Sequence, residues 1–283
     1  MNQRRIPLAT GLTYNVHEWD GPGDTTFVLV HGFTDLGAGW CEVAPRLAPH
    51  GHVLAPDLRG HGDSDRVGSG GYYHFLDYVA DLDDLVRQLA RSRVVLVGHS
   101  MGGSVSGYYA GTRPARIARL ALIEGLGPPD LTGSDGPTRT AMWIDAWRKV
   151  ATGERAVMPT LDEAARRLRR HDDLLDEALA RKLAELGTRA APGGFAWKHD
   201  PLHLTMGPYP FRLDVARAYW ERVTCPVLIV DGARSRLNLP EAERAARRAS
   251  FAHHRHLVIE DAGHAVQRHQ PARLAEAILA LAA

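Results

Sequence analysis

Two glycines flank a serine at the end of an apolar run, in the sequence Gly98-His-Ser100-Met-Gly102. Residues 94–97 are Val or Leu and small residues follow 101, so the serine falls at a tight turn from strand to helix. Such a turn strains the backbone of the serine and lifts its hydroxyl off the end of a sheet, and the glycines leave room for the adjacent strand and helix. The pattern predicts a nucleophilic Ser100 that attacks a carbonyl carbon.

A serine nucleophile also needs donors for the oxyanion that forms on that carbonyl. Residues 25–30, TTFVLV, predict a buried strand that runs directly into the loop His31-Gly-Phe-Thr-Asp. In acyl-transfer enzymes with such a serine, this loop supplies one backbone N–H and the residue after the nucleophile supplies the other. We therefore expect the oxyanion hole to consist of the N–H groups of Phe33 and Met101.

A general base is expected near the end of the chain, because such triads run in the order serine, acid, histidine. Residues 256–260 predict the last strand, and Asp261-Ala-Gly-His264 follows it, before a helical run that begins at Pro271. The sequence therefore predicts His264 as the general base.

Four blocks of sequence lie at the junctions between strands and the segments after them: HGFTD (31–35), DLRGHGDSD (57–65), GHSMGG (98–103) and DAGH (261–264). In these blocks the chain resembles the serine hydrolases of the α/β-hydrolase fold, over essentially its whole length. The resemblance implies a mostly parallel eight-stranded sheet with helices on both faces and an inserted helical cap. Because the second block is similar to the family's loop after the fourth strand, we interpret His61 and Asp63 as structural.

The triad acid is where the chain departs from many relatives. Those relatives carry an Asp a few residues beyond the strand at 226–231, where this chain has Ser235, and a hydroxyl cannot stabilise an imidazolium as a carboxylate does. Strand 120–123 ends in Glu124, and some branches of the family, similar to haloalkane dehalogenases and some esterases, carry the acid there. Because neighbouring strands lie only about 5 Å apart, a glutamate at one strand end can reach the same imidazole as an aspartate at the next. We predict Glu124 as the acid, with Asp231 as the alternative.

The order of predicted elements agrees with this architecture. Strands are predicted at 5–8, 13–19, 25–31, 52–56, 93–98, 118–124, 226–231 and 255–260, and helices at 38–48, 76–91, 101–112, 239–249 and 269–282. The alternation predicts a mostly parallel sheet whose first strands form a hairpin. Residues 1–125 and 225–283 would form the hydrolase core.

The intervening residues 126–224 contain amphipathic stretches and no clear strand, and they are too many for a loop, so we expect a helical cap. Trp143, Trp147 and Trp197 fall in it and are predicted to line an apolar acyl or alcohol pocket, the alternative being packing of the cap onto the core. Residues 192–211 are rich in Gly and Pro and predict an ordered loop, from which His199, Asp200 and His203 could face the pocket. The charged stretch at 163–182 is interpreted as a solvated helix face.

Composition excludes several other classes. The 283 residues carry a formal net charge of +1, so nothing favours nucleic acid or an anionic membrane as a partner. Two cysteines, Cys41 and Cys225, make no disulfide framework, and we see neither a signal peptide nor an apolar run long enough to span a membrane, which favours a cytoplasmic protein. No cofactor or metal is needed for the predicted chemistry, and the side chains of His253, His254 and His256 should diverge rather than converge on an ion. The expected partner is a small-molecule substrate, and the oligomeric state is left open.

Together these residues predict a serine hydrolase, carboxylesterase-like, that cleaves an ester-type bond through an acyl-enzyme. A serine at position 100 argues against a dehalogenase or epoxide hydrolase, since those need a carboxylate nucleophile. Hydrolysis of lactones, thioesters or carbon–carbon bonds, and perhydrolase chemistry, use the same machinery and remain open. A sensor that binds a small ligand without turnover is the alternative outside enzymes.

Overall fold

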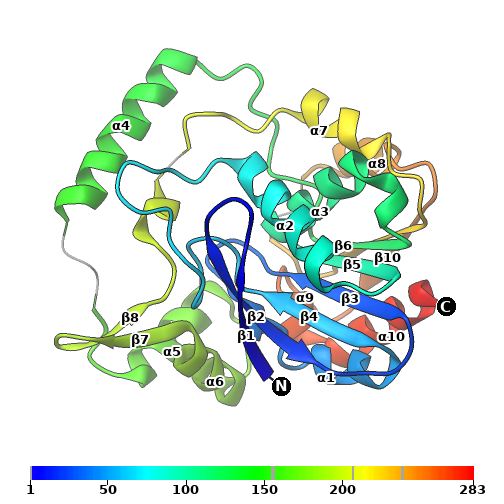
Figure 1. Ribbon diagram of the computed structural model, residues 1–283. Coiled ribbons are helices and arrows are strands. Elements are labelled where there is room, and N and C mark those ends of the chain that lie inside the picture. The colour runs from blue at the N-terminus through cyan, green and yellow to red at the C-terminus, as the bar shows by residue number, and fades with distance from the viewer. Residues whose placement is uncertain (1, 154–156, 206, 237–238) are drawn as a thin grey trace.

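A single twisted sheet forms the centre of the molecule (Figure 1). The computed structural model describes residues 2–153, 157–205, 207–236 and 239–283. The sheet has eight strands in the order β1-β2-β4-β3-β5-β6-β9-β10. Its strands are β1 (Asn2–Pro7), β2 (Thr13–Trp19), β3 (Thr25–Val30), β4 (His52–Pro56), β5 (Arg93–His99), β6 (Arg119–Ile123), β9 (Val227–Gly232) and β10 (His254–Ile259). The β1–β2 hairpin and the β2–β4 pair are antiparallel and the other pairs are parallel, which confirms the predicted sheet.

Helices cover both faces of the sheet, as predicted (Figure 1). On one face lie α2 (Phe75–Leu89), α3 (Met101–Thr112), α7 (Leu213–Trp220) and α8 (Glu241–Arg248), and on the other lie α1 (Ala44–Leu47), α9 (Val266–His269) and α10 (Pro271–Ala282). Successive side chains of the parallel strands enter two separate apolar cores, because they point alternately to the two faces. Leu96 belongs to the core under α2 and α3, and its neighbours Val95 and Val97 belong to the core under α10.

The helix expected at 38–48 is broken into three short pieces, which corrects that prediction. They are the 3₁₀ turn η1 (Gly37–Trp40), α1, and the 3₁₀ turn η2 (Ala48–His50). Pro45 and Pro49 stand at the first turns of the second and third pieces, and a proline has no N–H to continue a helix from the preceding turn. A further 3₁₀ turn, η3 (Pro114–Arg116), connects α3 to β6.

The segment between β6 and β9 contains the expected helices and also one β-hairpin, which the sequence did not predict. It comprises α4 (Gly136–Thr152), α5 (Leu161–His171), α6 (Glu177–Gly187), β7 (Thr188–Ala191), β8 (Gly194–Trp197), the 3₁₀ turn η4 (Pro201–Leu204) and α7. The hairpin was missed because each strand has only four residues, joined by a turn in which Gly193 and Gly194 have positive φ. A small separate core, which includes Met158, Leu175 and Leu183, holds α5 and α6 together.

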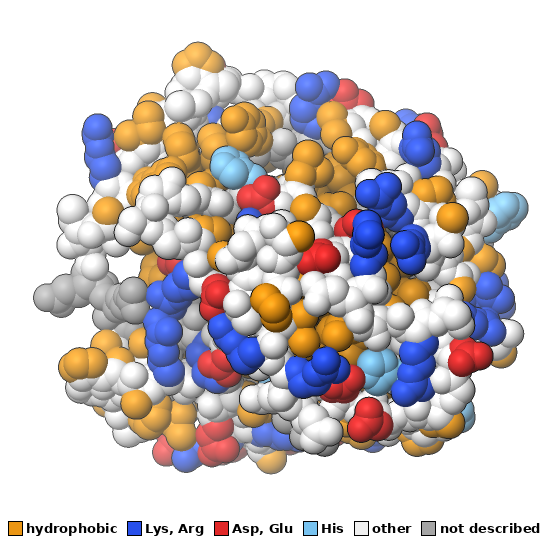
Figure 2. Space-filling model, in the orientation of Figure 1, with side chains coloured by type: hydrophobic (Ala, Val, Ile, Leu, Met, Phe, Trp, Pro, Cys, Tyr) orange, Lys and Arg blue, Asp and Glu red, His pale blue; other side chains and the backbone are white. Residues whose placement is uncertain are grey.

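The two ends of this segment sit differently from its middle. Helix α4 stands apart at the upper left of Figure 1, and none of its residues is buried. Apolar side chains gather in that part of the surface in Figure 2. Helix α7 instead packs against α3, with Ala216 and Trp220 buried in the main core. The layer over the strand ends is therefore made by α5, α6 and the β7–β8 hairpin, and we refer to residues 157–197 as the inner cap. Within the described residues, no helix is long and apolar enough to cross a membrane.

Candidate active site

Ser100 occupies the strained turn that the sequence predicts. Its φ of 53° lies in the left-handed region, between the end of β5 and the start of α3. A Cβ at Gly98 would lie 2.4 Å from the carbonyl oxygen of Gly102, and one at Gly102 would lie 2.4 Å from the carbonyl oxygens of Val30 and His31. Both glycines are therefore required by close backbone approach. The Ser100 N–H donates to the carbonyl of Ile123 at 2.9 Å, which ties the turn to the end of β6.

Glu124 and His264 meet beside this turn. Glu124 follows β6 and also has a positive φ, 51°. The distance from His264 Nδ1 to Glu124 Oε2 is 3.2 Å. Because an ionised carboxylate only accepts hydrogen bonds, Nδ1 carries the proton and Nε2 is free to accept one. The structure thus brings the predicted acid to the predicted base.

Two further donors hold the Glu124 carboxylate, whose side chain is 6 % exposed. The Gly232 N–H, at the end of β9, donates to Oε1 at 2.8 Å, and the Ser235 hydroxyl donates to Oε2 at 2.8 Å. Ser235 stands where the resemblance led us to expect an Asp, and here its hydroxyl donates to the predicted acid. The sequence marked the departure at 235 but gave no sign of this contact.

Asp231, the alternative acid, faces a different set of partners. His256 Nε2 lies 2.9 Å from Asp231 Oδ2, and the guanidinium groups of Arg244 and Arg248 lie 3.7 and 3.9 Å from the same oxygen. Asp231 lies within β9, so its side chain is confined to one face of the sheet. Glu124 follows the last residue of β6, so its side chain is not confined in this way. The geometry therefore favours Glu124 and rules against Asp231.

The loop that carries Phe33 is held by two neutral histidines. His31 accepts from the Leu58 N–H at 2.9 Å, and His61 accepts from the Thr34 N–H at 3.2 Å. Their other ring nitrogens lie 2.7 and 2.9 Å from backbone carbonyl oxygens, to which they donate. Burial lowers the pKa of both rings, which keeps them uncharged. The interpretation of His61 as structural agrees with this arrangement.

The same loop lies against the nucleophile. A Cβ at Gly32 would lie 3.1 Å from the Cβ of Ser100, so only glycine allows the loop this close. Met101 is the first residue of α3, so its N–H has no partner within the helix and lies at the positive end of the helix dipole. The oxyanion hole of Phe33 and Met101 stays a prediction, and the close approach of Gly32 to Ser100 is compatible with it.

A cavity of about 700 Å³ lies between the strand ends and the inner cap, and Ser100 and His264 both line it. The main body contributes Phe33, and the inner cap contributes Leu168, Leu174, Leu183 and Trp197. Charged side chains also line it, namely Asp35, Arg167, Asp172, Asp173, Lys198, Arg234, Arg236 and Arg268. Such a cavity is large enough for a small organic substrate and is lined by both apolar and charged side chains.

Trp143 and Trp147, which the sequence assigned to the pocket, do not line this cavity. Both lie on α4 and pack against Tyr72, with ring centroids 5.4 and 4.9 Å from that of the tyrosine. This contact agrees with the alternative, that these tryptophans pack the cap onto the core, because Tyr72 lies in a loop of the main body. Of the three tryptophans, Trp197 alone reaches the cavity.

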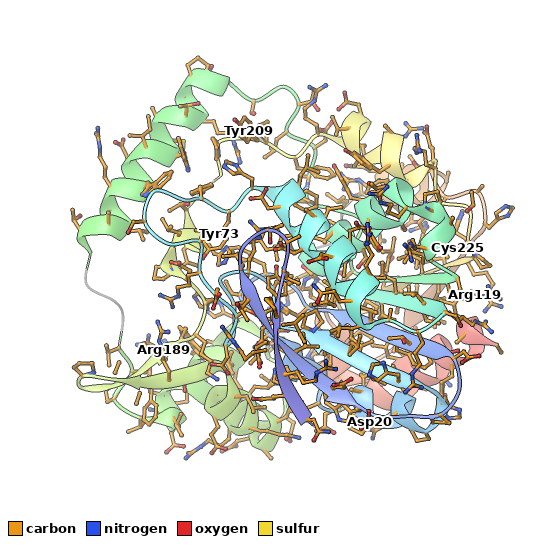
Figure 3. All side chains as sticks on the ribbon, viewed as in Figure 1. Asp20, Tyr73, Arg119, Arg189, Tyr209 and Cys225 are labelled. Atoms are coloured by element: carbon orange, nitrogen blue, oxygen red, sulfur yellow. The ribbon has the colours of Figure 1, made fainter. Side chains whose placement is uncertain are left out.

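The three polar residues of the Gly- and Pro-rich region divide in the same way. His199 lines the cavity, and burial lowers its pKa to about 4. His203 stacks on His61 with ring centroids 4.1 Å apart, and His61 accepts from Thr34 in the loop at 31–35, which we name the oxyanion loop after its predicted role. Asp200 caps η4 and accepts a hydrogen bond of 2.9 Å from Tyr73, which is labelled in Figure 3. Asp200 and His203 are therefore structural.

The described residues contain one group with the spacing of a metal site, outside this cavity. It consists of Glu18, Asp20 and His52. Asp20 follows β2 near the lower edge of Figure 3. Glu18 already pairs with Arg4 at 3.3 Å and with His52 at 2.6 Å, so the group is satisfied by an internal ion pair. The side chains of His254 and His256 diverge as expected, to the Phe251 carbonyl and to Asp231.

Comparisons with known proteins agree with this fold. Residues 25–268 match the α/β-hydrolase fold family. A serine hydrolase-like protein of Danio rerio is 30% identical over 64% of this chain and 56% of its own length, and a 2-hydroxy-6-oxo-2,4-heptadienoate hydrolase of Pseudomonas putida is 38% identical over 44% and 45%. The chain thus spans about half the length of these curated relatives.

Among solved structures, the thioesterase domain from the curacin biosynthetic pathway superposes with a TM-score of 0.87 at 27% identity, over 99% of both chains. A hypothetical protein of Pseudomonas aeruginosa PAO1 gives 0.86 at 28% identity, over 99% of this chain and 98% of its own. The chain belongs to the α/β-hydrolase fold family.

Proposed function

We propose that the protein is a carboxylesterase-like serine hydrolase that cleaves an ester-type bond with Ser100, His264 and Glu124. The observation that carries the proposal is the contact of His264 Nδ1 with Glu124 Oε2 at the edge of a cavity that Ser100 also lines. Ser100, Glu124 and His264 each follow a different strand, in the chain order typical of this family, which supports the proposal.

The steps follow from the hydrogen bonds. His264 donates through Nδ1 to Glu124, so its Nε2 takes the Ser100 proton as Oγ attacks the carbonyl carbon. The N–H groups of Phe33 and Met101 donate to the oxyanion of the tetrahedral intermediate. The intermediate collapses to an acyl-enzyme as the imidazolium protonates the leaving alcohol, and water attacks the acyl group by the reverse sequence of proton transfers. Glu124 stabilises the imidazolium in both halves of the reaction.

Thioester hydrolysis is the second candidate, for one specific reason. The curacin thioesterase domain matches 99% of this chain with a TM-score of 0.87, so the similarity extends beyond the sheet to the inserted segment that lines the cavity. The predicted chemistry is the same, with a thiol in place of the alcohol as the leaving group. The two candidates therefore differ in the substrate and not in the roles of the residues.

A covalent probe tests the shared mechanism. The purified protein and its Ser100→Ala variant would be treated with a fluorophosphonate and their intact masses measured. A single stoichiometric adduct on the wild type alone would support an activated Ser100. If the folded wild type forms no adduct, the proposal is overturned in favour of a ligand-binding sensor.

Matched substrates then separate the two candidates. Oxygen esters and thioesters with the same acyl chain, from acetyl to decanoyl, would be compared by kcat/KM. Preference for the oxygen ester at every chain length supports the esterase. A consistently higher value for the thioester, after correction for its faster uncatalysed hydrolysis, would favour the second candidate.

A further inference from the structure

Two consecutive side chains of α9 connect the catalytic loop to the rest of the site. Gln267 Nε2 lies 3.2 Å from Nδ1 of His99, the residue before the nucleophile. Arg268 donates to Asp35, at the end of the oxyanion loop, at 2.8 Å. Helix α9 begins two residues after His264, so these contacts fix the position of the helix relative to both the nucleophile and the oxyanion loop.

The next residue of α9, His269, connects the inner cap to the same loop. Its Nδ1 accepts the backbone N–H of Gly263 at 3.0 Å, and its Nε2 lies 2.8 Å from Oδ1 of Asp172. A ring nitrogen that accepts from a backbone N–H carries no proton, so the proton is on Nε2 and is donated to the carboxylate. The His269 side chain is 2 % exposed, and these hydrogen bonds run unbroken from Asp172, at the end of α5, to Gly263.

Gly263 is the residue immediately before the general base, and its surroundings limit where it can move. A Cβ at Gly263 would lie 3.3 Å from Leu174 of the inner cap and 3.5 Å from His269. At the next residue, the carbonyl oxygen of His264 lies 2.9 Å from His99 Nε2 and accepts a hydrogen bond from it. The backbone at His264 is thus held from the nucleophile side by His99 and from the cap side by Asp172 and Leu174.

From these contacts we infer that Asp172 of the inner cap, acting through His269, is a positioning residue for the general base His264. Turnover then requires the inner cap to be docked, because an undocked cap removes the acceptor that orients His269. The inference rests on the proposed function in one respect, the role of His264 as general base. A displacement of about 1 Å at a catalytic group can lower a rate about 100-fold, so a modest shift of this loop has a measurable effect.

The adjacent residue provides a matched control. Asp173 also lines the cavity and also carries a carboxylate, but its partner is the exposed Arg236, at 2.7 Å, and not α9. Three variants form the comparison: Asp172→Ala, which removes the acceptor; Asp172→Asn, whose amide oxygen can still accept from His269; and Asp173→Ala. Melting temperature and circular dichroism would verify that each is folded.

Kinetics on an uncharged ester give the first measurement. Asp172→Ala should lower kcat by about 10- to 100-fold with little change in KM, whereas Asp172→Asn should stay within about threefold of wild type. Asp173→Ala, whose side chain lines the cavity but does not contact α9, should show its effect in KM and not in kcat. A loss that appears only in KM would overturn the inference, because Asp172 would then be a substrate contact. An equal loss of kcat in Asp173→Ala would also overturn it, because the effect would then follow from the loss of any carboxylate that lines the cavity.

Hydrogen exchange gives a second measurement that does not depend on turnover. The Gly263 amide should exchange at least about tenfold faster in Asp172→Ala than in wild type, and Asp173→Ala should leave it unchanged. If Asp172→Ala does not fold, His269→Phe removes the same hydrogen bonds and should show the same faster exchange. Unchanged exchange in a folded variant refutes the positioning role even if the enzyme is active. If the fluorophosphonate does not label the wild type, the proposed function is refuted. The exchange measurement would still test whether Asp172 holds the backbone at Gly263, because it does not depend on catalysis.

Discussion

Replacement of Glu124 by glutamine should abolish most of the activity, for a reason that the hydrogen bonds make specific. Three donors converge on the two carboxylate oxygens: the Gly232 N–H on Oε1, and the Ser235 hydroxyl and His264 Nδ1 on Oε2. A glutamine has one acceptor oxygen and one NH₂ group. If its oxygen keeps the bond from the rigid backbone of Gly232, its NH₂ faces His264.

The NH₂ group forces His264 to accept at Nδ1, and the ring proton then moves to Nε2. A histidine in that tautomer cannot take the proton of Ser100, which is the first step of the reaction. In triads of this type, an acid-to-amide change costs about 10⁴ in kcat. We expect Glu124→Gln to lower kcat/KM by about 10³- to 10⁴-fold, which corresponds to about 4 to 5.5 kcal/mol of transition-state stabilisation.

The matched control is Asp231→Asn, which changes the other candidate acid. Its partners are His256, Arg244 and Arg248, so we expect a lower melting temperature and a kcat/KM within about threefold of wild type. Both variants would be assayed on the same ester and by their rate of fluorophosphonate labelling. If Glu124→Gln keeps nearly full activity while the folded Asp231→Asn loses it, the assignment of the acid is wrong.

Three further predictions follow from individual contacts. Burial lowers the pKa of His203 to about 4 and that of His99 to about 3, well below the value near 6.5 of an unfolded chain. On acidification, these histidines therefore take up protons in the unfolded state before they do so in the folded state. Each should lower the free energy of unfolding by up to about 1.4 kcal/mol per pH unit between pH 6.5 and pH 4. Calorimetry should give a lower melting temperature at pH 5 than at pH 7, and equal values would contradict this. Trp197→Ala should raise KM for long acyl esters by about tenfold, because it removes cavity lining, whereas Trp143→Ala should leave KM unchanged; the reverse result would move the substrate site to α4. The Glu124→Ala variant should regain at least about tenfold in kcat/KM when Ser235→Asp is added. The side chains of Ser235 and Glu124 are 2.8 Å apart, so a carboxylate at 235 would lie within reach of His264. No recovery would show that the imidazole is oriented for position 124 alone.

Most of the fold, and the predictions of Ser100 and His264, follow from the sequence without the structure. The parallel strands were recognisable because they are buried on both faces and read as continuous apolar runs. Ser100 was recognisable because the turn that carries it excludes every residue but glycine at two nearby positions, and that requirement is written locally in the chain. His264 followed from its place after the last strand.

The sequence predicted Glu124 but left Asp231 as an alternative, since both carboxylates lie at or near the end of a strand. That choice depends on the side of the sheet to which each side chain points and on the strands that lie next to one another, and β6 is adjacent to β9 only in the folded sheet. The same holds for the tryptophans. The place of a tryptophan in the inserted segment does not show what it contacts, because its neighbours come from distant parts of the chain. Trp143 packs against Tyr72, whereas Trp197 lines the cavity. The contact of Asp172 with His269 joins residues 97 positions apart, and neither residue carries a local signal of it. Strand and turn formation is governed by neighbours in sequence, whereas the composition of a site is governed by neighbours in space, and these are set only when the sheet and the cap pack together.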